Sequence, residues 1–442
     1  MMKIKHILFS ALLFSACDVL DQQPEDLIPT SEAIIDKQSA TSAVNGIYHA
    51  LQDGDYYGGR YILATEMVAG NGTASAFQAF WQELASGRVP VSNFHVEDSW
   101  IALYNVVNAA NAVIEAVPNV GELDESEKND MLGQAYFLRG LAFFDALRQY
   151  GEFYNTGSEF GIPLKLQPSL APSETARATV ANSYVQIESD LQEAIDRLGN
   201  GSPFFASQTA AKALKARVHL YQNEFGLAET LASEVIDELG ALPPDYNEIY
   251  TTEESAEAIF ELEFIQQDDP NVWSIEMYNN PPEVSVTDGL IDFLSNRNEN
   301  ERGMLFETLG NGLNRCIKYG TEAIEDGENT IVIRLSEMYL IRAEALGRSG
   351  VPNDALPDLN AVRNRAGLTS LTNIASDAEL ITTLLNERRA EFAYEGHYWF
   401  DMVRYGRMET IRGLESFRRI FPIPRREINI SDGTLVQNPE YN

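Results

Sequence analysis

The chain has 442 residues, enough for two or three average domains or one large helical domain, and 44% of them are hydrophobic, which allows a sizeable core. It contains 32 Lys and Arg against 66 Asp and Glu, giving a formal net charge of −34. Such an acidic surface repels nucleic acid, anionic lipid headgroups and polyanionic ligands. We therefore expect no nucleic-acid partner and a neutral or cationic ligand, unless the acidity serves solubility alone.

The first 16 residues have the layout of a bacterial lipoprotein signal peptide. Lys3 and Lys5 form a basic start, an apolar run extends from Ile7 to Phe14, and small residues precede Cys17. This run is shorter than the roughly 20 apolar residues of a membrane-spanning helix. We expect cleavage before Cys17 and lipidation of its thiol, so that the lipid alone attaches the protein to the membrane. An ordinary cleaved signal peptide is the alternative.

Residues 17–37 are expected to form a lipidated, flexible tether. Residues 18–29 are polar and acidic, contain two prolines and show no periodicity. If Cys17 carries the lipid, Cys316 has no disulfide partner. A small packed side chain is then its more common role.

Helical periodicity dominates the rest of the chain. Amphipathic helices are predicted at residues 40–51, 99–117, 130–150 and 180–198. Residues 210–239 and 334–366 look like two copies of one unit, each a helix, a tight turn and a second helix with an early alanine. Small residues let paired helices pack closely, as in tetratricopeptide-like repeats.

Two segments between the helices have a different character. Residues 53–94 are rich in Gly, Asn and aromatic residues, and residues 265–319 are long, irregular and also carry aromatic residues. Loops of this length are usually functional or disordered, and aromatic side chains argue against disorder. We expect both segments to be ordered.

The sharpest signature lies in the C-terminal third. Residues 386–396 read NERRAEFAYEG, residues 398–406 read YWFDMVRYG, and FPIP and QNP follow at 421–424 and 437–439. An earlier stretch, residues 136–144, reads YFLRGLAFF. Together with the lipoprotein signal and the helix pairs, these motifs resemble the SusD/RagB family of outer-membrane nutrient-binding lipoproteins over essentially the whole chain.

The resemblance implies both a fold and a partner. The fold would be mostly α-helical, a single SusD-like domain over residues 38–442, with tetratricopeptide-like helix pairs supporting long irregular loops that form the binding face. The partner would be a SusC-like TonB-dependent outer-membrane transporter. The protein, lipid-anchored and facing outside the cell, would capture an oligosaccharide and deliver it to this transporter. Some family members bind peptides, so a peptide is the alternative ligand.

The motif at residues 386–396 also allows an enzymatic interpretation, as a cell-surface glycosidase. Glu387, Glu391 and Glu395 lie on one helical face and could act as general acid and base. Arg388 and Arg389 are close in sequence, however, and can pair with these acids. We favour structural ion pairs and predict that the protein is not an enzyme, as the resemblance also implies.

No metal centre or cofactor is predicted. The histidines outside the signal peptide are His49, His95, His219 and His397. None lies in an HExxH motif and the chain has no CxxC motif, so a catalytic zinc site is not expected. A structural Ca²⁺ ion in an acidic loop is left open.

Ligand recognition is therefore assigned to the aromatic-rich segments. Sugar rings have flat C–H faces that pack on aromatic rings, while polar side chains bind the hydroxyl groups. The predicted aromatic contacts are Trp81 with Phe77 and Phe80, and Trp273 with Tyr278. The predicted polar contacts are Glu66, Arg60, Asn71 and Gln78. The alternative for each aromatic is burial in the core. A neutral glycan such as a β-glucan or fructan is the expected ligand.

Overall fold

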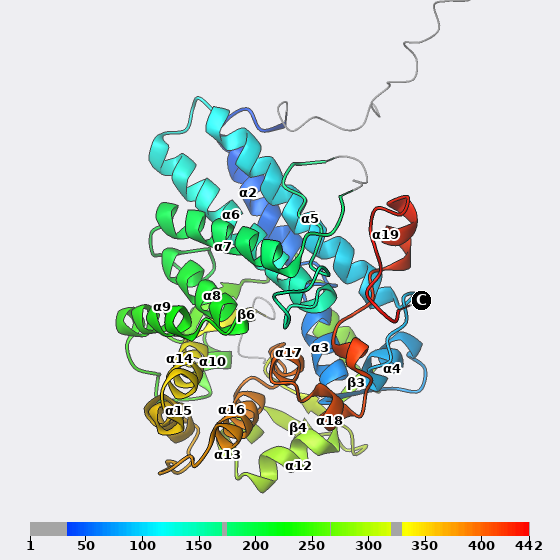
Figure 1. The fold of residues 1–442 in the computed structure, drawn as a ribbon, viewed down its shortest axis with the longest axis vertical. Coiled ribbons are helices and arrows are strands. Elements are labelled where there is room, and N and C mark those ends of the chain that lie inside the picture. Colours follow the sequence, from blue (N-terminus) through cyan, green and yellow to red (C-terminus); the bar gives the residue numbers. More distant parts are fainter. Residues whose placement is uncertain (1–32, 170–174, 266, 320–328, 442) are drawn as a thin grey trace, which may run out of the picture.

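The computed structural model describes residues 33–169, 175–265, 267–319 and 329–441 (Figure 1). The signal peptide predicted at residues 1–16, the lipidation site Cys17 and the tether as far as residue 32 lie outside the described residues. The fold is mostly α-helical, as predicted, and its strands are short.

A row of long helices forms one part of the molecule. Each helix packs against the next along the chain, from α2 and α5 through α6, α7 and α8 to α9. The last of these packs on α14, which in turn contacts α15 and α16 (Figure 1). The row consists of α2 (Lys37–Leu51), α5 (Phe94–Ala116), η1 (Val117–Asn119), α6 (Glu125–Tyr150), α7 (Val180–Arg197), α8 (Gln208–Tyr221), α9 (Phe225–Leu239), α14 (Leu335–Ser349), η2 (Pro352–Ala355), α15 (Leu356–Arg365) and α16 (Asp377–Glu391).

The helices predicted from periodicity are all present, and both repeated units form helix pairs, α8 with α9 and α14 with α15. Three of the helices, α2, α5 and α6, begin several residues before their predicted starts. In α2 and α6, polar caps extend the helix beyond the apolar pattern. The Asp36 carboxylate accepts the N–H of Ser39 at 2.8 Å at the start of α2. The Asp124 carboxylate accepts the N–H of Glu127 at 2.9 Å at the start of α6.

Glycines allow the close approach of α6 and α7. A Cβ atom at Gly133 would lie 2.6 Å from Leu198 Cγ, and one at Gly140 would lie 3.3 Å from Leu191 Cδ2. Such contacts leave no room for a larger side chain at Gly133. The small-residue packing predicted for the helix pairs thus extends to this neighbouring pair.

Short helices and strands make up the remaining part. The helices are α3 (Arg60–Ala69), α4 (Ala79–Ser86), α10 (Glu248–Thr251), α11 (Val272–Glu276), α12 (Asp288–Asn296), α13 (Asn300–Gly303), α17 (Tyr398–Arg404), α18 (Met408–Arg412), η3 (Ser416–Arg419) and α19 (Arg425–Ile430). The strands are β1 (Gly72–Ala74), β2 (Ala258–Leu262), β3 (Val284–Val286), β4 (Phe306–Thr308), β5 (Asn314–Cys316) and β6 (Thr330–Arg334).

The strands form two small antiparallel sheets. One has the order β1-β3-β5-β4, and the other pairs β2 with β6. The first sheet joins the two aromatic-rich segments, because β1 belongs to one of them and β3, β4 and β5 to the other. Cys316 is buried on β5, and burial raises the pKa of its thiol to about 12. It is therefore a packed side chain rather than a reactive one.

A buried ion-pair network links α16 to the part of the molecule made of short helices and strands. The Glu391 carboxylate accepts from Arg334 Nη1 at 2.6 Å and from Arg302 Nε at 2.8 Å, and it also pairs with Arg365. Burial opposes ionisation, but these three guanidinium groups hold the pKa of Glu391 well below its usual value.

Glu387 pairs with Arg302 in the same interior. The acids of the motif at residues 386–396 therefore form ion pairs, as predicted, but with basic residues that are distant in sequence. The neighbouring Arg388 pairs with Asp401 instead, and Arg389 donates to Asn71.

Residues Phe94–Asn119, which include α5, form the one described helix that is long and apolar enough to cross a membrane. Within its apolar window, 61% of the residues are buried inside the protein. This helix packs against both α2 and α6. Its apolar surface is thus explained by its place in the helix row.

Candidate functional site

The two aromatic-rich segments meet at the edge of the four-stranded sheet. Gly72 of β1 lies opposite Val286 of β3, and beyond the strands the Ser75 N–H donates to the Glu283 carbonyl at 2.8 Å. The turn that leads into α4 therefore lies beside the loop between α11 and β3. We call the surface formed by residues 75–80 and 274–283, together with Arg60, the candidate face.

Trp81 does not form the exposed platform that the sequence predicted. Its side chain is fully buried on α4, where it lies against Phe80 with ring centroids 4.9 Å apart. Its indole N–H donates to Glu276 Oε2 at 2.8 Å. Burial removes a large apolar surface from water, and the carboxylate satisfies the one polar group of the ring. Trp81 supports the candidate face from beneath.

Trp273 is likewise buried and offers no open ring face. It stacks on Tyr319, with centroids 4.1 Å apart and an interplanar angle of 15°. The start of α3 packs closely on it, because a Cβ atom at Gly59 would lie 2.7 Å from Val272 Cγ1 and 3.3 Å from Trp273 Nε1. Gly59 also has a φ of +140°, a conformation that side chains rarely adopt. Trp273 therefore fastens α11 to α3.

Two of the predicted polar contacts, Glu66 and Asn71, are also buried. Asn71 Nδ2 donates to Glu66 Oε2 at 2.6 Å, and Arg389 Nη2 donates to Asn71 Oδ1 at 2.8 Å. Burial is the main cause that raises the pKa of Glu66 to about 7. These side chains link α3 to α16 inside the protein, where a surface-bound ligand does not reach them.

The other predicted residues reach the surface at the candidate face. Phe77 is 94% exposed, and Phe80, Gln78, Tyr278 and Arg60 are half-buried. The guanidinium group of Arg315, on β5, lies 5.3 Å from the centre of the Tyr278 ring. The face thus combines aromatic surface with nearby hydrogen-bonding groups.

Charged groups form an ordered base for this aromatic surface. Arg60 Nε donates to Glu276 Oε1 at 3.1 Å, and Arg60 Nη1 donates to Asp55 Oδ1 at 3.1 Å. The indole N–H of Trp81 donates to the other oxygen of Glu276, so both oxygens of this carboxylate accept hydrogen bonds. Burial and the neighbouring Glu276 carboxylate together raise the pKa of Glu283, while Gln78 lowers it. Glu283 and Gln78 therefore lie next to each other, and both are half-buried, at the edge of the candidate face that we call the polar rim.

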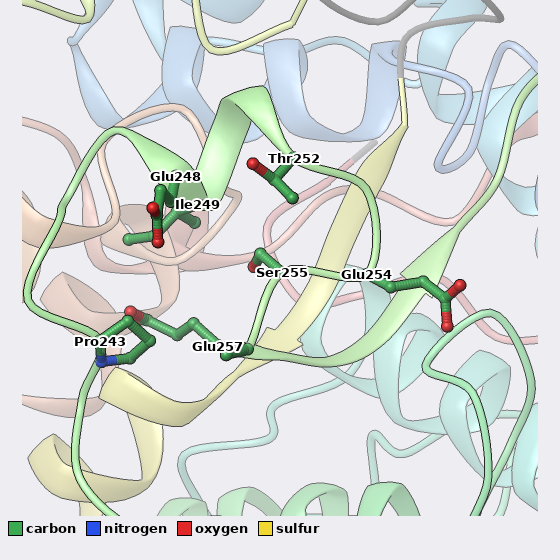
Figure 2. Close-up of a pocket in the computed structure, with 8 residues that line it drawn as sticks. Pro243, Glu248, Ile249, Thr252, Glu254, Ser255 and Glu257 are labelled. Atoms are coloured by element: carbon green, nitrogen blue, oxygen red, sulfur yellow. The ribbon is translucent and has the colours of Figure 1, made fainter.

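Neither of two cavities found in the described part of the chain is lined by residues of the candidate face. A small cavity of about 70 Å³ lies elsewhere, between α10 and the segment leading into β2. Figure 2 shows Glu248 and Ile249 on α10, with Ser255 and Glu257 on the facing segment. This volume is far below the roughly 300 Å³ of the smallest typical ligand pockets. A second concavity, beside Trp100 and α19, is smaller still, about 20 Å³.

Several residues in the face or in contact with it were not predicted from the sequence. Asp55, Glu276, Glu283 and Arg315 contact or lie beside the predicted ones, and Ile275 is 49% exposed. In the sequence, only their position within the aromatic-rich segments indicates them. The hydrogen bonds of Glu276 with Arg60 and Trp81, for example, join residues about 200 positions apart, and the sequence does not show such contacts.

The chain matches two family models. Residues 18–220 match a model described as "Starch-binding associating with outer membrane", and residues 286–416 match one described as "SusD family". SusD-like protein P38 of Formosa agariphila is 26% identical to this chain, over 98% of each.

Solved structures of similar proteins superpose on nearly the whole of this chain. A SusD superfamily protein from Bacteroides thetaiotaomicron superposes with a TM-score of 0.80 at 24% identity, covering 92% of this chain and 100% of that one. A laminarin-binding SusD-like protein superposes with a TM-score of 0.75 at 25% identity, with the same coverage. With both family models, a full-length relative and this fold in agreement, the chain belongs to the SusD/RagB family.

Proposed function

We propose that this protein is a glycan-binding lipoprotein of the outer membrane, anchored by Cys17 and facing outside the cell. It captures a neutral oligosaccharide at the candidate face and delivers it to a SusC-like TonB-dependent transporter. The observation that carries the proposal is the exposure of Phe77. This side chain is 94% exposed on a turn that the hydrogen bond from the Ser75 N–H to the Glu283 carbonyl joins to the segment carrying Tyr278.

Phe77 is suited to a sugar ring. A phenylalanine side chain exposed to this extent loses the free energy that burial would give, about 2 kcal/mol for a large apolar side chain. A ligand that covers its ring recovers part of that energy. The turn is also held in place, by the Ser75 N–H on Glu283 and by the indole of Trp81 on Glu276. An ordered platform loses little conformational entropy on binding.

The polar rim can bind the hydroxyl groups of the same ligand. Arg60 is a donor only, Glu283 is an acceptor when ionised, and the Gln78 amide can do both. A sugar hydroxyl both donates and accepts, so these groups complement it. The net charge of −34 favours a neutral glycan over a polyanionic one. Laminarin binding by a relative of this fold and the starch-binding description of a matching family model give further support.

The same proposal includes the absence of catalysis. The three acids that suggested a glycosidase are buried in ion pairs: Glu387 with Arg302, Glu391 with Arg334 and Glu395 with Lys318. A general acid must reach the glycosidic oxygen within hydrogen-bonding distance. Carboxylates held by arginine and lysine in the interior are not positioned for this.

The test is affinity electrophoresis of the chain from Asp18 onward in gels that contain laminarin, starch, a fructan or a sulfated glycan. We expect retardation by one neutral glycan. Phe77→Ala should weaken it about tenfold, equivalent to about 1.4 kcal/mol. Phe205→Ala is the matched control, because Phe205 is also an exposed phenylalanine (51%) but packs on Tyr48, away from the candidate face.

Each part of the proposal can fail separately. Unchanged retardation of Phe77→Ala would exclude the candidate face while leaving glycan binding intact. No retardation by any neutral glycan would exclude a glycan ligand and bring forward a peptide. Release of reducing ends from the bound glycan would contradict the absence of catalysis. Failure of the detergent-solubilised lipoprotein to co-purify with a TonB-dependent barrel would contradict the delivery role.

A further inference from the structure

Three side chains of metal-binding type meet where α7, α8 and α9 adjoin within the helix row, outside the candidate face. Glu188 lies on α7, His219 lies near the end of α8, and Glu224 is the N-cap residue of α9. One ligand atom of each, a carboxylate oxygen or an imidazole nitrogen, lies within 4.8 Å of the other two. Within the described part of the chain, this is the one group of three or more such residues that meets this distance.

The local backbone holds two of the three side chains together. The chain turns tightly between α8 and α9, where the Glu224 N–H donates to the His219 carbonyl at 2.9 Å and Asn223 has a φ of +61°. His219 Nδ1 then lies 2.6 Å from Glu224 Oε2. The third side chain, Glu188, is oriented by Gln222, whose Nε2 donates to Glu188 Oε1 at 2.6 Å.

The charge at this place is not balanced by neighbouring cations. Among the described residues, neither Glu188 nor Glu224 forms an ion pair with a lysine or an arginine; the one partner of this type is His219, on Glu224. Glu188 acts electrostatically on Lys215, but the ammonium group of Lys215 donates to Gln192 Oε1. Two carboxylates thus converge on a single imidazole.

The group is both ordered and open to ions. The His219 side chain is 4% exposed, so its ring position is set by packing, while the Glu224 side chain is 44% exposed and Glu188 is half-buried. A metal ion can therefore enter from the Glu224 side. A water molecule can complete the coordination there, as in sites with three protein ligands.

The donor set selects a class of metal. One imidazole nitrogen and two carboxylate oxygens suit Zn²⁺ and its transition-metal neighbours, whereas Ca²⁺ takes six to eight oxygen ligands. With metal–ligand distances near 2.1 Å, the donor atoms of a tetrahedral site lie about 3.4 Å apart. The Glu224 oxygen must move away from His219 Nδ1, from 2.6 Å, by less than about 1 Å through side-chain rotation. The Glu188 donor atom lies within 4.8 Å of both other donors, so side-chain rotation can also adjust its position.

We propose that Glu188, His219 and Glu224 form a binding site for a Zn²⁺-type divalent metal ion, which fastens α7 to the α8–α9 pair. The ion has a structural role, because it joins three helices of the scaffold and lies apart from the candidate face. It binds the folded chain and thereby raises the temperature of unfolding in proportion to the logarithm of metal concentration above the Kd. Glycan binding does not depend on it.

The test is titration of Zn²⁺ into the purified full chain, free of a polyhistidine tag and treated with a chelator, followed by calorimetry and by thermal unfolding. We expect one Zn²⁺ ion per chain and a rise in Tm, with no rise on addition of Ca²⁺. Glu188→Gln and Glu224→Gln should each weaken Zn²⁺ binding at least tenfold. Both substitutions conserve shape at positions that are not fully buried, so the fold should persist, as circular dichroism would verify.

Glu234→Gln is the matched control, since this carboxylate on α9 is partly exposed and pairs with Lys212 outside the group. It should bind Zn²⁺ as the wild type does. Absence of Zn²⁺ binding by the wild type would overturn the proposal. Equal binding by the wild type and both site variants would also overturn it, because it would indicate adventitious binding to the acidic surface.

Discussion

Arg334 shows at the scale of single residues how this acidic chain uses its few cations. Its guanidinium donates to Glu391 Oε1 at 2.6 Å, to Glu257 Oε1 at 2.7 Å and to Glu395 Oε2 at 2.7 Å, and all four side chains are buried. A buried charge is tolerated only when it is paired and hydrogen-bonded. Arg334 is thus the centre of several charge pairs at once.

Removing Arg334 should be costly. We expect Arg334→Ala to lower the free energy of unfolding by about 3–5 kcal/mol, because three carboxylates lose a common partner in the interior. Urea unfolding monitored by circular dichroism measures the loss. In the control Glu234→Ala, which breaks the exposed pair with Lys212, the loss should be at most about 1 kcal/mol. Equal losses in the two variants would contradict the central role of Arg334.

Glu66 should make stability depend on pH. Burial raises its pKa from the usual 4.5 to about 7 in the folded state. Between pH 4.5 and 7 the folded chain therefore holds a proton that the unfolded chain releases, so the stability contributed by this group is lost as pH rises through this window. The loss amounts to about 3 kcal/mol at most.

Glu66→Gln removes this titration and keeps the shape of the side chain. We expect the variant to gain stability relative to the wild type as pH rises from about 4.5 to about 7, and the difference to level off above it. Urea unfolding of both proteins across this range measures the difference, in which the titration of other groups, such as Glu261, cancels. A difference that is constant with pH would show that Glu66 titrates at its usual value.

The elements show how far local rules determine this fold. The apolar spacing of the long helices acts within a few residues, and these helices were predicted from it. The caps at Asp36 and Asp124 are equally local, but they were not used in the prediction, so two predicted starts were several residues late. The ends of short elements depend more on glycine and on distant contacts. Gly87 ends α4 with a φ of +68°, and a Cβ atom there would lie 2.3 Å from Leu414 Cδ1.

Two glycines should therefore respond in opposite ways to the same substitution. Gly46 lies exposed in the middle of α2, and a Cβ atom there would meet nothing within 4 Å. We expect Gly46→Ala to raise the free energy of unfolding by about 0.5–1 kcal/mol through helix propensity. Gly87→Ala should lower it by about 1–3 kcal/mol through left-handed strain and the clash with Leu414. Denaturant unfolding of the two variants, side by side, tests both signs.

For the molecule as a whole, the dominant property is its net charge of −34. A field of one sign repels polyanions over distances set by the Debye length and leaves neutral ligands unaffected. The fold superposes on its relatives over more than nine-tenths of the chain, so the helix row and the loops above it form the common framework.

The charge leads to a prediction about salt. The affinity for a neutral glycan should change less than about twofold between about 20 mM and about 500 mM NaCl, because no net charge is neutralised on binding. A sulfated glycan should not bind at low salt. Calorimetric titration at both salt concentrations measures this. A strong decrease in affinity for the neutral glycan at high salt would indicate that ionic contacts carry the binding.

Local sequence determined the helical class and the helix pairs. It also indicated that the acids of the motif at residues 386–396 form ion pairs, but it did not identify their partners, which are distant in sequence. Helical periodicity and capping act over three to four residues, so they are readable without a structure. The same sequence pointed to Phe77, Phe80, Gln78, Tyr278 and Arg60, which reach the surface, but gave no means of separating them from the buried Trp81 and Trp273.

Only the tertiary structure decided which aromatic rings are exposed and which charged groups meet. Trp81 is buried because its indole finds Glu276, 195 residues away along the chain, and Trp273 because it stacks on Tyr319. Glu188 reaches His219 and Glu224 only because α7 packs against α8. Burial and ion pairing depend on every element packed around a side chain. Such contacts are long-range, and neither composition nor spacing contains them.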